Sequence, residues 1–243
     1  VAKKYGASIL EYFAPLTDNV VVANIMMRPH MQALKRQFTA ELIKNYKFTF
    51  MYCYLIEFGD MYRRAAFMDI RDIYFQKDPF LGVPCDGLTA YTETSSLLVR
   101  NRDYIYRDHY PKHCKTNWEN FQNLPPLNSG GFLADVTTMK EIVKLSDQIL
   151  VECGPGFDQG TFNEIIYNKM LSVKSSLFTT ELGPVAMICN SLTVQTNNIQ
   201  EICNEMGNPF SIVHQFDRFR GIADLYTRKY PFNASEFIKF IKT

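Results

Sequence analysis

Short hydrophobic runs along the chain alternate with longer segments in which hydrophobic positions recur at helical spacing. The clearest short run is Ala65–Met68, which ends directly at Asp69 in the manner of a buried strand that reaches a sheet edge. A weaker run lies at Gly87–Tyr91. Four further strands are expected on the same grounds, at residues 7–12, 131–136, 184–189 and 211–213.

Three segments show the spacing of amphipathic helices. The first is 31–47, and the second is expected to start near Thr138 and run to about Val151, with Glu141 completing a capping box. The third begins at Asp158. Its predicted buried face consists of Phe162, Ile165, Ile166 and Met170. Strands that alternate with helices predict an α/β fold with a mostly parallel sheet, in which ligands bind at the carboxyl ends of the strands.

Composition places the chain among ordinary globular proteins of one domain. It has 243 residues, 47% of them hydrophobic and 21% charged, with no internal repeat or linker. The net charge of +1 lacks the basic excess of a nucleic-acid-binding surface, so nucleic acid is not an expected partner. No apolar run is long enough to span a bilayer. The chain begins at Val1 rather than Met, so a membrane anchor could lie outside it. The glycosylation sequon Asn233–Ala234–Ser235 favours a secretory compartment.

Two carboxylates follow the strand at 65–68, and they are the strongest chemical signal in the chain. Asp69 and Asp72 are three positions apart with Arg71 between them, and the turn Asp78–Pro79 comes shortly after. On its own, such a pair often caps a turn while the arginine forms an ion pair. Alternatively, carboxylates at a strand end are a suitable platform for Mn²⁺ or Mg²⁺, which prefer oxygen ligands and keep water and substrate phosphates in their shell.

The segment 67–80 as a whole resembles the acidic motif of glycosyltransferases with the GT-A fold, in which a strand ends in Asp-x-Asp and continues to an Asp–Pro–Phe turn. When the two are aligned on Asp78–Pro79–Phe80, the second acid falls on Asp72 and the first falls one place after Asp69. The resemblance implies a single Rossmann-like GT-A domain over residues 1–243. That domain would be incomplete at its N-terminus, lacking the first strand and loop that hold the nucleotide base.

Three later segments fit the same family, in the same order along the chain. Asn128–Ser129–Gly130 alone would be an ordinary turn, Asp158–Gln159 the start of a helix, and His214 a structural histidine. Together they resemble the Asn–Ser–Gly segment, the Asp–Gln–x–x–x–Asn motif and the C-terminal histidine of GT-A enzymes. The order of the four segments makes the resemblance more specific than any one of the last three.

The resemblance implies a role for each residue of these segments. The implied metal ligands are Asp69, Asp72 and His214. The residues implied to bind the sugar and diphosphate of the donor are Arg71, Asn128, Ser129, Gly130 and Arg218. The catalytic residues implied to face the transferred sugar are Asp158 and Gln159.

These roles describe a metal-dependent glycosyltransferase. It would use Mn²⁺ or Mg²⁺ to offset charge on the departing diphosphate of a nucleotide-sugar donor, with UDP-sugars favoured, and would pass the sugar to a hydroxyl of a glycan or protein acceptor. The Asp–Gln motif favours retention of configuration, whereas inversion would require Asp158 as a general base. The family resemblance and the sequon together favour the Golgi or endoplasmic reticulum lumen.

Two alternatives stay open. A nucleotidyltransferase of related fold would need a glycine-rich N-terminal loop with a basic residue, and the loop is not in this chain. A catalytically inactive transferase-like scaffold could bind glycans without turnover, and the wider spacing of Asp69 and Asp72 permits it. Nucleotide binding that depends on manganese would separate the enzyme from the scaffold.

Overall fold

A computed structural model describes residues 47–69, 72–93, 98–99, 118–153, 158–188, 195–198 and 200–229. The expected strand at 7–12, nearly all of the expected helix at 31–47 and the sequon at 233–235 lie outside these residues. The described part is a mixed α/β protein with four α-helices and three small sheets. None of its helices is both long and apolar enough to cross a bilayer.

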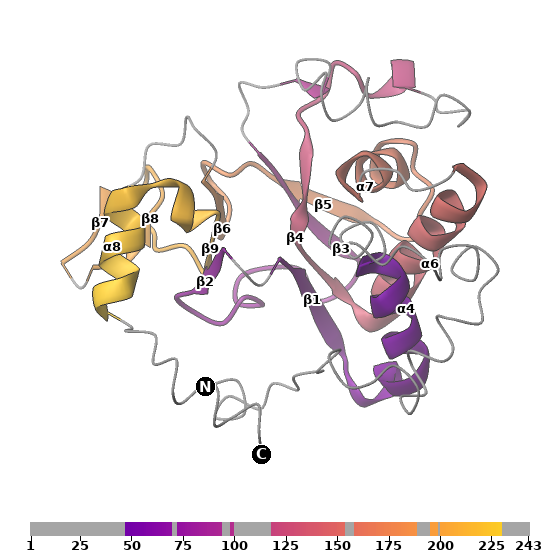
Figure 1. Cartoon of the computed structure of the whole chain (residues 1–243), viewed down its shortest axis with the longest axis horizontal. Helices are drawn as coiled ribbons and strands as arrows, with labels where there is room; N and C mark the ends of the chain where they lie inside the picture. The colour runs from indigo at the N-terminus through magenta and orange to yellow at the C-terminus, as the bar shows by residue number, and fades with distance from the viewer. Residues whose placement is uncertain are drawn as a thin grey trace, which may run out of the picture.

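The helices and strands follow one another in mixed order along the chain (Figure 1). The α-helices are α4 (Lys47–Phe58), α6 (Val136–Cys153), α7 (Asp158–Tyr167) and α8 (Arg220–Lys229). The 3-10 helices are η2 (Gly59–Met61), η4 (Trp118–Asn120) and η5 (Phe216–Arg218). The strands are β1 (Arg64–Met68), β2 (Ile73–Phe75), β3 (Leu88–Thr92), β4 (Leu127–Asp135), β5 (Ser175–Phe178), β6 (Val185–Met187), β7 (Gln195–Thr196), β8 (Ile202–Cys203) and β9 (Ile212–His214).

The main sheet has the order β1-β4-β3-β5 and is mixed rather than mostly parallel, so the sequence-based expectation was wrong on this point. The central strand β4 runs antiparallel to both β1 and β3, and β3 runs parallel to β5. The reason for the error is physical: a hydrophobic run indicates a buried strand but carries no information on the direction in which that strand crosses the sheet.

A second sheet, β2-β9-β6, lies beside the main one, and β7 pairs with β8 in a third (Figure 1). Gln76, which follows β2, holds this region together. Its Nε2 donates to the carbonyl oxygens of Ile202 (2.9 Å) and Phe210 (2.8 Å), and its Oε1 accepts from the Ile202 N–H (2.7 Å) and the Tyr226 hydroxyl (3.1 Å). One amide therefore connects β2, β8, the segment before β9, and α8.

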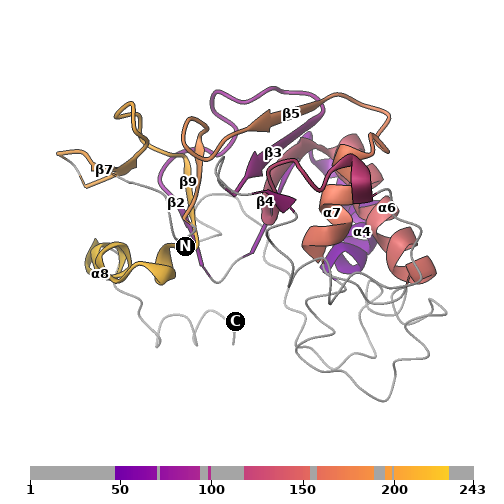
Figure 2. The same cartoon turned by 90° about the horizontal axis from the view of Figure 1, so that it is seen from above.

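Helices α4, α6 and α7 cover one face of the main sheet (Figure 2). Four buried phenylalanine rings run across this layer in a continuous stack. Phe48 of α4 lies 5.0 Å from Phe67 of β1, Phe67 lies 4.9 Å from Phe132 of β4, and Phe132 lies 4.5 Å from Phe162 of α7, between ring centroids. Offset aromatic pairs of this kind add about 0.5–1.5 kcal/mol each to the stabilisation from burial. The stack packs the first turn of α4 and the middle of α7 against the sheet.

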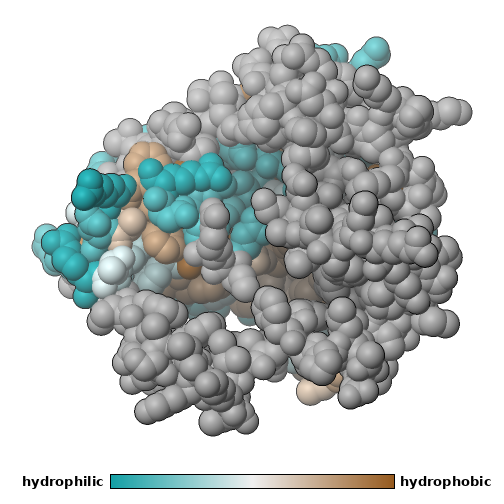
Figure 3. All heavy atoms as spheres, viewed as in Figure 1, coloured by the Kyte–Doolittle hydropathy of each residue, from teal (hydrophilic) through white to brown (hydrophobic). Residues whose placement is uncertain are grey.

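The surface on the α8 side of the molecule is largely hydrophilic (Figure 3). Helix α8 contributes exposed charges there, including Arg220 and Asp224, which form an i,i+4 pair with 4.0 Å between nitrogen and oxygen. Pairs this exposed contribute little to stability.

Most local predictions are confirmed, and two differ in an informative way. Strands were expected at the positions of β1, β3, β6 and β9, and the structure has them there. Strand β4 begins at Leu127, four residues earlier than expected, so Asn128 and Gly130 lie inside the strand instead of in a turn before it. In α7, the predicted face is buried except for Met170, which lies beyond the helix end and is 41% exposed.

Helix α6 starts as predicted but is capped by a different residue. The N–H of Thr138 donates to Asp135 Oδ1 (2.8 Å), and its hydroxyl donates to Asp135 Oδ2 (2.7 Å). The expected capping box between Thr138 and Glu141 was wrong, because Glu141 instead accepts from the N–H (2.9 Å) and hydroxyl (2.8 Å) of Ser172. Asp135 is the N-cap residue.

The Asp135 cap predicts a pH dependence of stability. Burial raises the pKa of this carboxyl, but hydrogen bonds from Thr138, Gly87 and Thr137 outweigh burial and lower the pKa below its ordinary value. Its contribution is therefore complete above the unfolded pKa, near 3.9, and is lost as the pH falls through the lower folded value. We expect Asp135→Ala to reduce the free energy of unfolding by about 0.5–2 kcal/mol at neutral pH, and by less in acid.

Urea unfolding at pH 7 and pH 3 measures this effect, with Asp86→Ala as the control, because Asp86 is a nearby but exposed carboxylate. An equal loss at both pH values would show that the charge of the cap contributes nothing.

Candidate functional site

Strand register brings Asp69 next to Gly130. Strand β1 pairs antiparallel with β4 so that Met68 lies opposite Gly131, and the N–H of Asp69 then donates to the carbonyl oxygen of Gly130 (2.8 Å). The side chain of Asn128, two residues earlier on β4, accepts the N–H of Gly130 at its Oδ1 (2.7 Å). The first acid and the Asn–Ser–Gly segment therefore form one side of a common site.

The register of the second sheet brings Asp72 next to His214. Ile73 of β2 lies opposite His214 of β9, and the N–H of Gln215 donates to the carbonyl oxygen of Asp72 (2.6 Å). Gln215 has φ 63°, in the left-handed region that few residues other than glycine adopt, and it turns the chain from β9 into η5. As a result, Asp72 Oδ1 lies 3.5 Å from His214 Nε2, and the two residues are only 6% and 1% exposed.

The other ring nitrogen of His214 faces a methionine. Met187 of β6 is the parallel neighbour of His214, and its sulfur lies 3.1 Å from Nδ1. A proton on Nδ1 can be donated to this sulfur, a weak acceptor, which leaves a lone pair on Nε2. Among the described residues, Nε2 has no hydrogen-bond partner. A buried lone pair that faces a carboxylate oxygen is unfavourable unless a proton or a cation lies between them.

These atoms suit a divalent cation. Magnesium lies about 2.0–2.1 Å from its oxygen ligands, so one ion can reach two donor atoms that are 3.5 Å apart. Gly130 allows the side chains of His214 and Asp69 to lie against β4, because a Cβ at this position would lie only 2.5 Å from His214 Cε1 and 2.6 Å from Asp69 Oδ2. In the part of the chain that the structure describes, no three acidic, histidine or cysteine side chains are already grouped as a metal site. The assignment of Asp69 as third ligand therefore stays a prediction.

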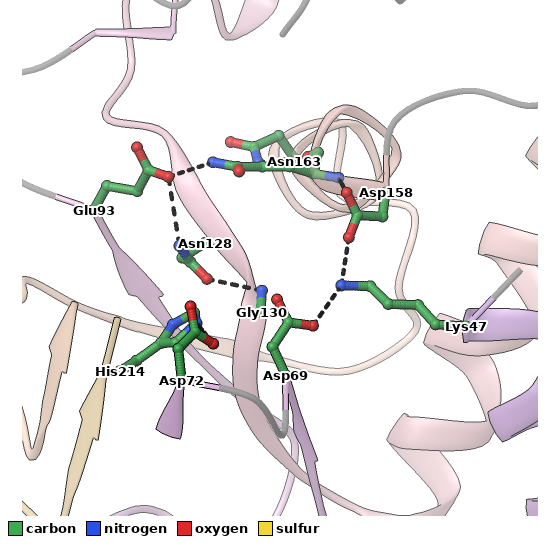
Figure 4. Close-up of polar contacts among 10 residues, drawn as sticks. Lys47, Asp69, Asp72, Glu93, Asn128, Gly130, Asp158, Asn163 and His214 are labelled. Carbon is green, nitrogen blue, oxygen red and sulfur yellow. Dashed lines mark hydrogen bonds and ion pairs between the residues drawn. The ribbon is translucent and has the colours of Figure 1, made fainter. Parts of the chain in front are cut away.

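Lys47 is a member of the site that sequence analysis missed. It is the first residue of α4, and its ammonium contacts Asp69 Oδ1 (3.1 Å) and Asp158 Oδ2, while lying 5.3 Å from the centroid of the Phe67 ring (Figure 4). Burial lowers the pKa of this amine, but the charges of Asp158 and Asp69 outweigh burial and raise the pKa above its ordinary value. The ammonium group of Lys47 thus joins the acidic turn after β1 to the first turn of α7.

Glu93 is the second residue that sequence analysis missed. It follows β3 and is 5% exposed, and its Oε1 accepts from Gln159 Nε2 (2.9 Å). The same oxygen accepts from Asn128 Nδ2 (3.4 Å) (Figure 4). Its own N–H donates to the carbonyl oxygen of Pro126 (2.9 Å), which fixes it beside the start of β4. A buried carboxylate therefore connects Asn128, predicted to bind the donor, with Gln159, predicted to be catalytic.

Asn163 fixes the start of α7 to the same strand. Its Oδ1 accepts the Leu127 N–H (2.8 Å), and its Nδ2 donates to the carbonyl oxygens of Leu127 (2.8 Å) and Gln159 (2.7 Å). Asp158 and Gln159 occupy the first turn of the helix that Asn163 anchors, and Asp158 Oδ1 also accepts the Gln159 N–H (2.8 Å). The asparagine that ends the Asp–Gln–x–x–x–Asn segment thus has a structural role.

The structure brings together seven of the ten predicted residues. These are Asp69, Asp72, Asn128, Gly130, Asp158, Gln159 and His214. Ser129 is buried in β4, between two members of the site, and Arg218 is exposed in η5. Arg71 lies outside the described residues.

No model of a known protein family matches this chain, and a search of curated proteins finds no match to it. Its function must therefore be inferred from the site.

Proposed function

We propose that this protein is a metal-dependent glycosyltransferase with a Rossmann-like GT-A domain, which transfers a sugar from a nucleotide-sugar donor, preferably a UDP-sugar, to an acceptor hydroxyl. The observation that carries the proposal is the buried pair of Asp72 and His214, in which Asp72 Oδ1 lies 3.5 Å from His214 Nε2. This ring nitrogen has no hydrogen bond to any described residue. Next to this pair lie the amides and carboxylates of a connected polar site.

In this account, Asp72 and His214 would hold the cation, with Asp69 as the third ligand. A bound Mn²⁺ or Mg²⁺ would supply positive charge to the diphosphate leaving group. The glycine at 130 has no side chain, which allows two of the proposed ligands, His214 and Asp69, to lie close to the backbone of β4. The residues that face the sugar are then Asn128, Asp158 and Gln159.

The surroundings of Asp158 favour retention of configuration. Both of its oxygens already have partners, since Oδ1 accepts the Gln159 N–H and Oδ2 contacts the Lys47 ammonium. A general base for inversion would need a free oxygen within hydrogen-bond reach of the acceptor hydroxyl. Asp158 is better placed to orient its neighbours and to stabilise positive charge on the sugar in the transition state.

The contact of Asp69 with Lys47 is the observation that favours the alternative, a scaffold that binds glycans without turnover, because it engages one oxygen of a proposed ligand. The two functions differ in whether a donor is consumed.

Release of UDP from a panel of UDP-sugars in the presence of Mn²⁺ tests the proposal. We expect turnover with at least one donor, and a loss of about 100-fold or more in Asp158→Ala, the range typical of removing a group that stabilises charge in the transition state. Asp224→Ala, which removes an exposed carboxylate on α8, is the control. No release of UDP from any donor would favour the scaffold instead.

A further inference from the structure

We propose that Glu93 is a positioning residue that sets the orientation of two side-chain amides, those of Asn128 and Gln159. It thereby determines whether the carbonyl or the NH₂ end of each amide faces the donor sugar. The part of this proposal that concerns the sugar rests on the proposed function. The part that concerns the amides does not.

The chemistry of the three side chains fixes the orientation. A carboxylate oxygen accepts hydrogen bonds and does not donate them, whereas each amide has one NH₂ donor end and one carbonyl acceptor end. Oε1 of Glu93 accepts from both amides, so each must turn its NH₂ toward Glu93 and its carbonyl oxygen away. With a neutral partner in place of Glu93, either end of each amide could face it.

The two carbonyl oxygens then have defined positions. Asn128 Oδ1 accepts the N–H of Gly130, which fixes the strand at the point where the donor is proposed to lie. Gln159 Oε1 receives no hydrogen bond from the residues that the structure describes, and in this proposal it is the acceptor that faces the sugar. The site therefore presents a fixed carbonyl acceptor, which suits a hydroxyl group that donates a hydrogen bond.

In this proposal, Glu93 acts through the two amides and does not itself contact the ligand. It is 5% exposed, and it lies directly after an irregularity in the β3–β4 pairing between Ala90 and Thr92. Bulges of this kind redirect the side chains that follow them, and they often occur beside functional sites. A buried carboxylate is also a poor choice for stability alone, because its desolvation opposes folding. Both facts favour a functional reason for an acid at this position.

Glu93→Gln is the informative variant, because glutamine has nearly the same shape but has an NH₂ group that needs an acceptor. This glutamine can present either its carbonyl oxygen or its NH₂ group to the partner amides, so Asn128 and Gln159 are no longer held in one orientation. We expect the KM for the UDP-sugar to rise, or kcat to fall, by about tenfold, the equivalent of one hydrogen bond. Affinity for UDP in the presence of Mn²⁺ should change less than about twofold, because UDP carries no sugar to contact the amides.

A second measurement is independent of enzymatic activity. In ¹⁵N-labelled protein, the side-chain NH₂ resonances of Asn128 and Gln159 can be assigned from their loss in Asn128→Ala and Gln159→Ala. We expect both NH₂ groups to be protected from hydrogen exchange in the wild type and at least one to lose protection in Glu93→Gln. Glu119→Gln, which alters an exposed acid, is the control and should leave both unchanged.

The outcomes separate the two proposals. Altered NH₂ resonances in a protein that consumes no UDP-sugar would support the role of Glu93 and contradict the proposed function. Unchanged resonances in Glu93→Gln would overturn the role of Glu93. An equal loss of UDP and UDP-sugar affinity would also overturn it, because Glu93 would then support the whole site and not the amides in particular.

Discussion

Replacing Lys47 with methionine is expected to lower turnover by about 100-fold, the effect of misplacing reacting groups by roughly 1 Å. The ammonium of Lys47 is in contact with Asp69 and Asp158, which belong to the two halves of the site. Methionine keeps the length and apolar stem of lysine but removes the charge. The two carboxylates would then lie close together without a cation between them, and their repulsion would move the acidic turn away from α7.

The same substitution should reduce the free energy of unfolding by about 1–3 kcal/mol, the cost of leaving a partly buried polar partner unsatisfied. Steady-state kinetics and urea unfolding measure the two effects, and Lys144→Met, on the exposed face of α6, is the matched control. Lys47→Arg should keep most of the stability, since it keeps the charge, but should lose activity because its planar guanidinium has a different shape. Wild-type turnover in Lys47→Met would refute this role.

The substitution Gly130→Ala adds a single methyl group, and we expect it to have the second largest effect, which falls on stability and on metal binding. The Cβ of alanine would lie 2.5 Å from His214 Cε1 and 2.6 Å from Asp69 Oδ2, well inside van der Waals contact. Both side chains would have to move. We expect a loss of stability of about 1–3 kcal/mol from overpacking. We also expect a fall of roughly 10–100-fold in Mn²⁺ affinity, as for other changes that displace metal ligands.

Gly221→Ala is the matched control, because nothing lies within 4 Å of a Cβ at that position in α8. Alanine there should be neutral or should stabilise the helix by up to about 1 kcal/mol. Manganese titration and urea unfolding of both variants measure these effects. If Gly130→Ala bound Mn²⁺ as tightly as wild type, the space beside Gly130 would not belong to the metal site.

Sequence patterns predicted the parts of the site that depend on local order. The apolar run before Asp69, the helix that begins at Asp158 and the late strand that ends at His214 are all visible in the spacing of hydrophobic residues, and the structure has each of them. The cap of α6 shows where local rules become ambiguous. Asp135 and Thr138 both satisfy the preference for an N-cap, and only the structure distinguishes them.

The parts that were missed depend on contacts between distant segments. Lys47 reaches a carboxylate 22 residues away, and Glu93 receives a hydrogen bond from a residue 66 positions later. Neither residue lies in a sequence motif, and from the sequence alone each would be interpreted as an ordinary surface charge. Their positions follow from the direction of β4, which a hydrophobic run does not reveal, and from the phenylalanine stack that places α4 and α7 on the same sheet.

A calorimetric titration of UDP, with and without Mn²⁺, tests the central claim most directly. Wild type is compared with Asp72→Ala and with Asp78→Ala, which removes an exposed carboxylate from the same segment, after urea unfolding confirms that all three are folded. We predict UDP binding that requires Mn²⁺ in wild type and Asp78→Ala and that is lost in Asp72→Ala. UDP binding that is independent of Mn²⁺ and unchanged in Asp72→Ala would contradict the account.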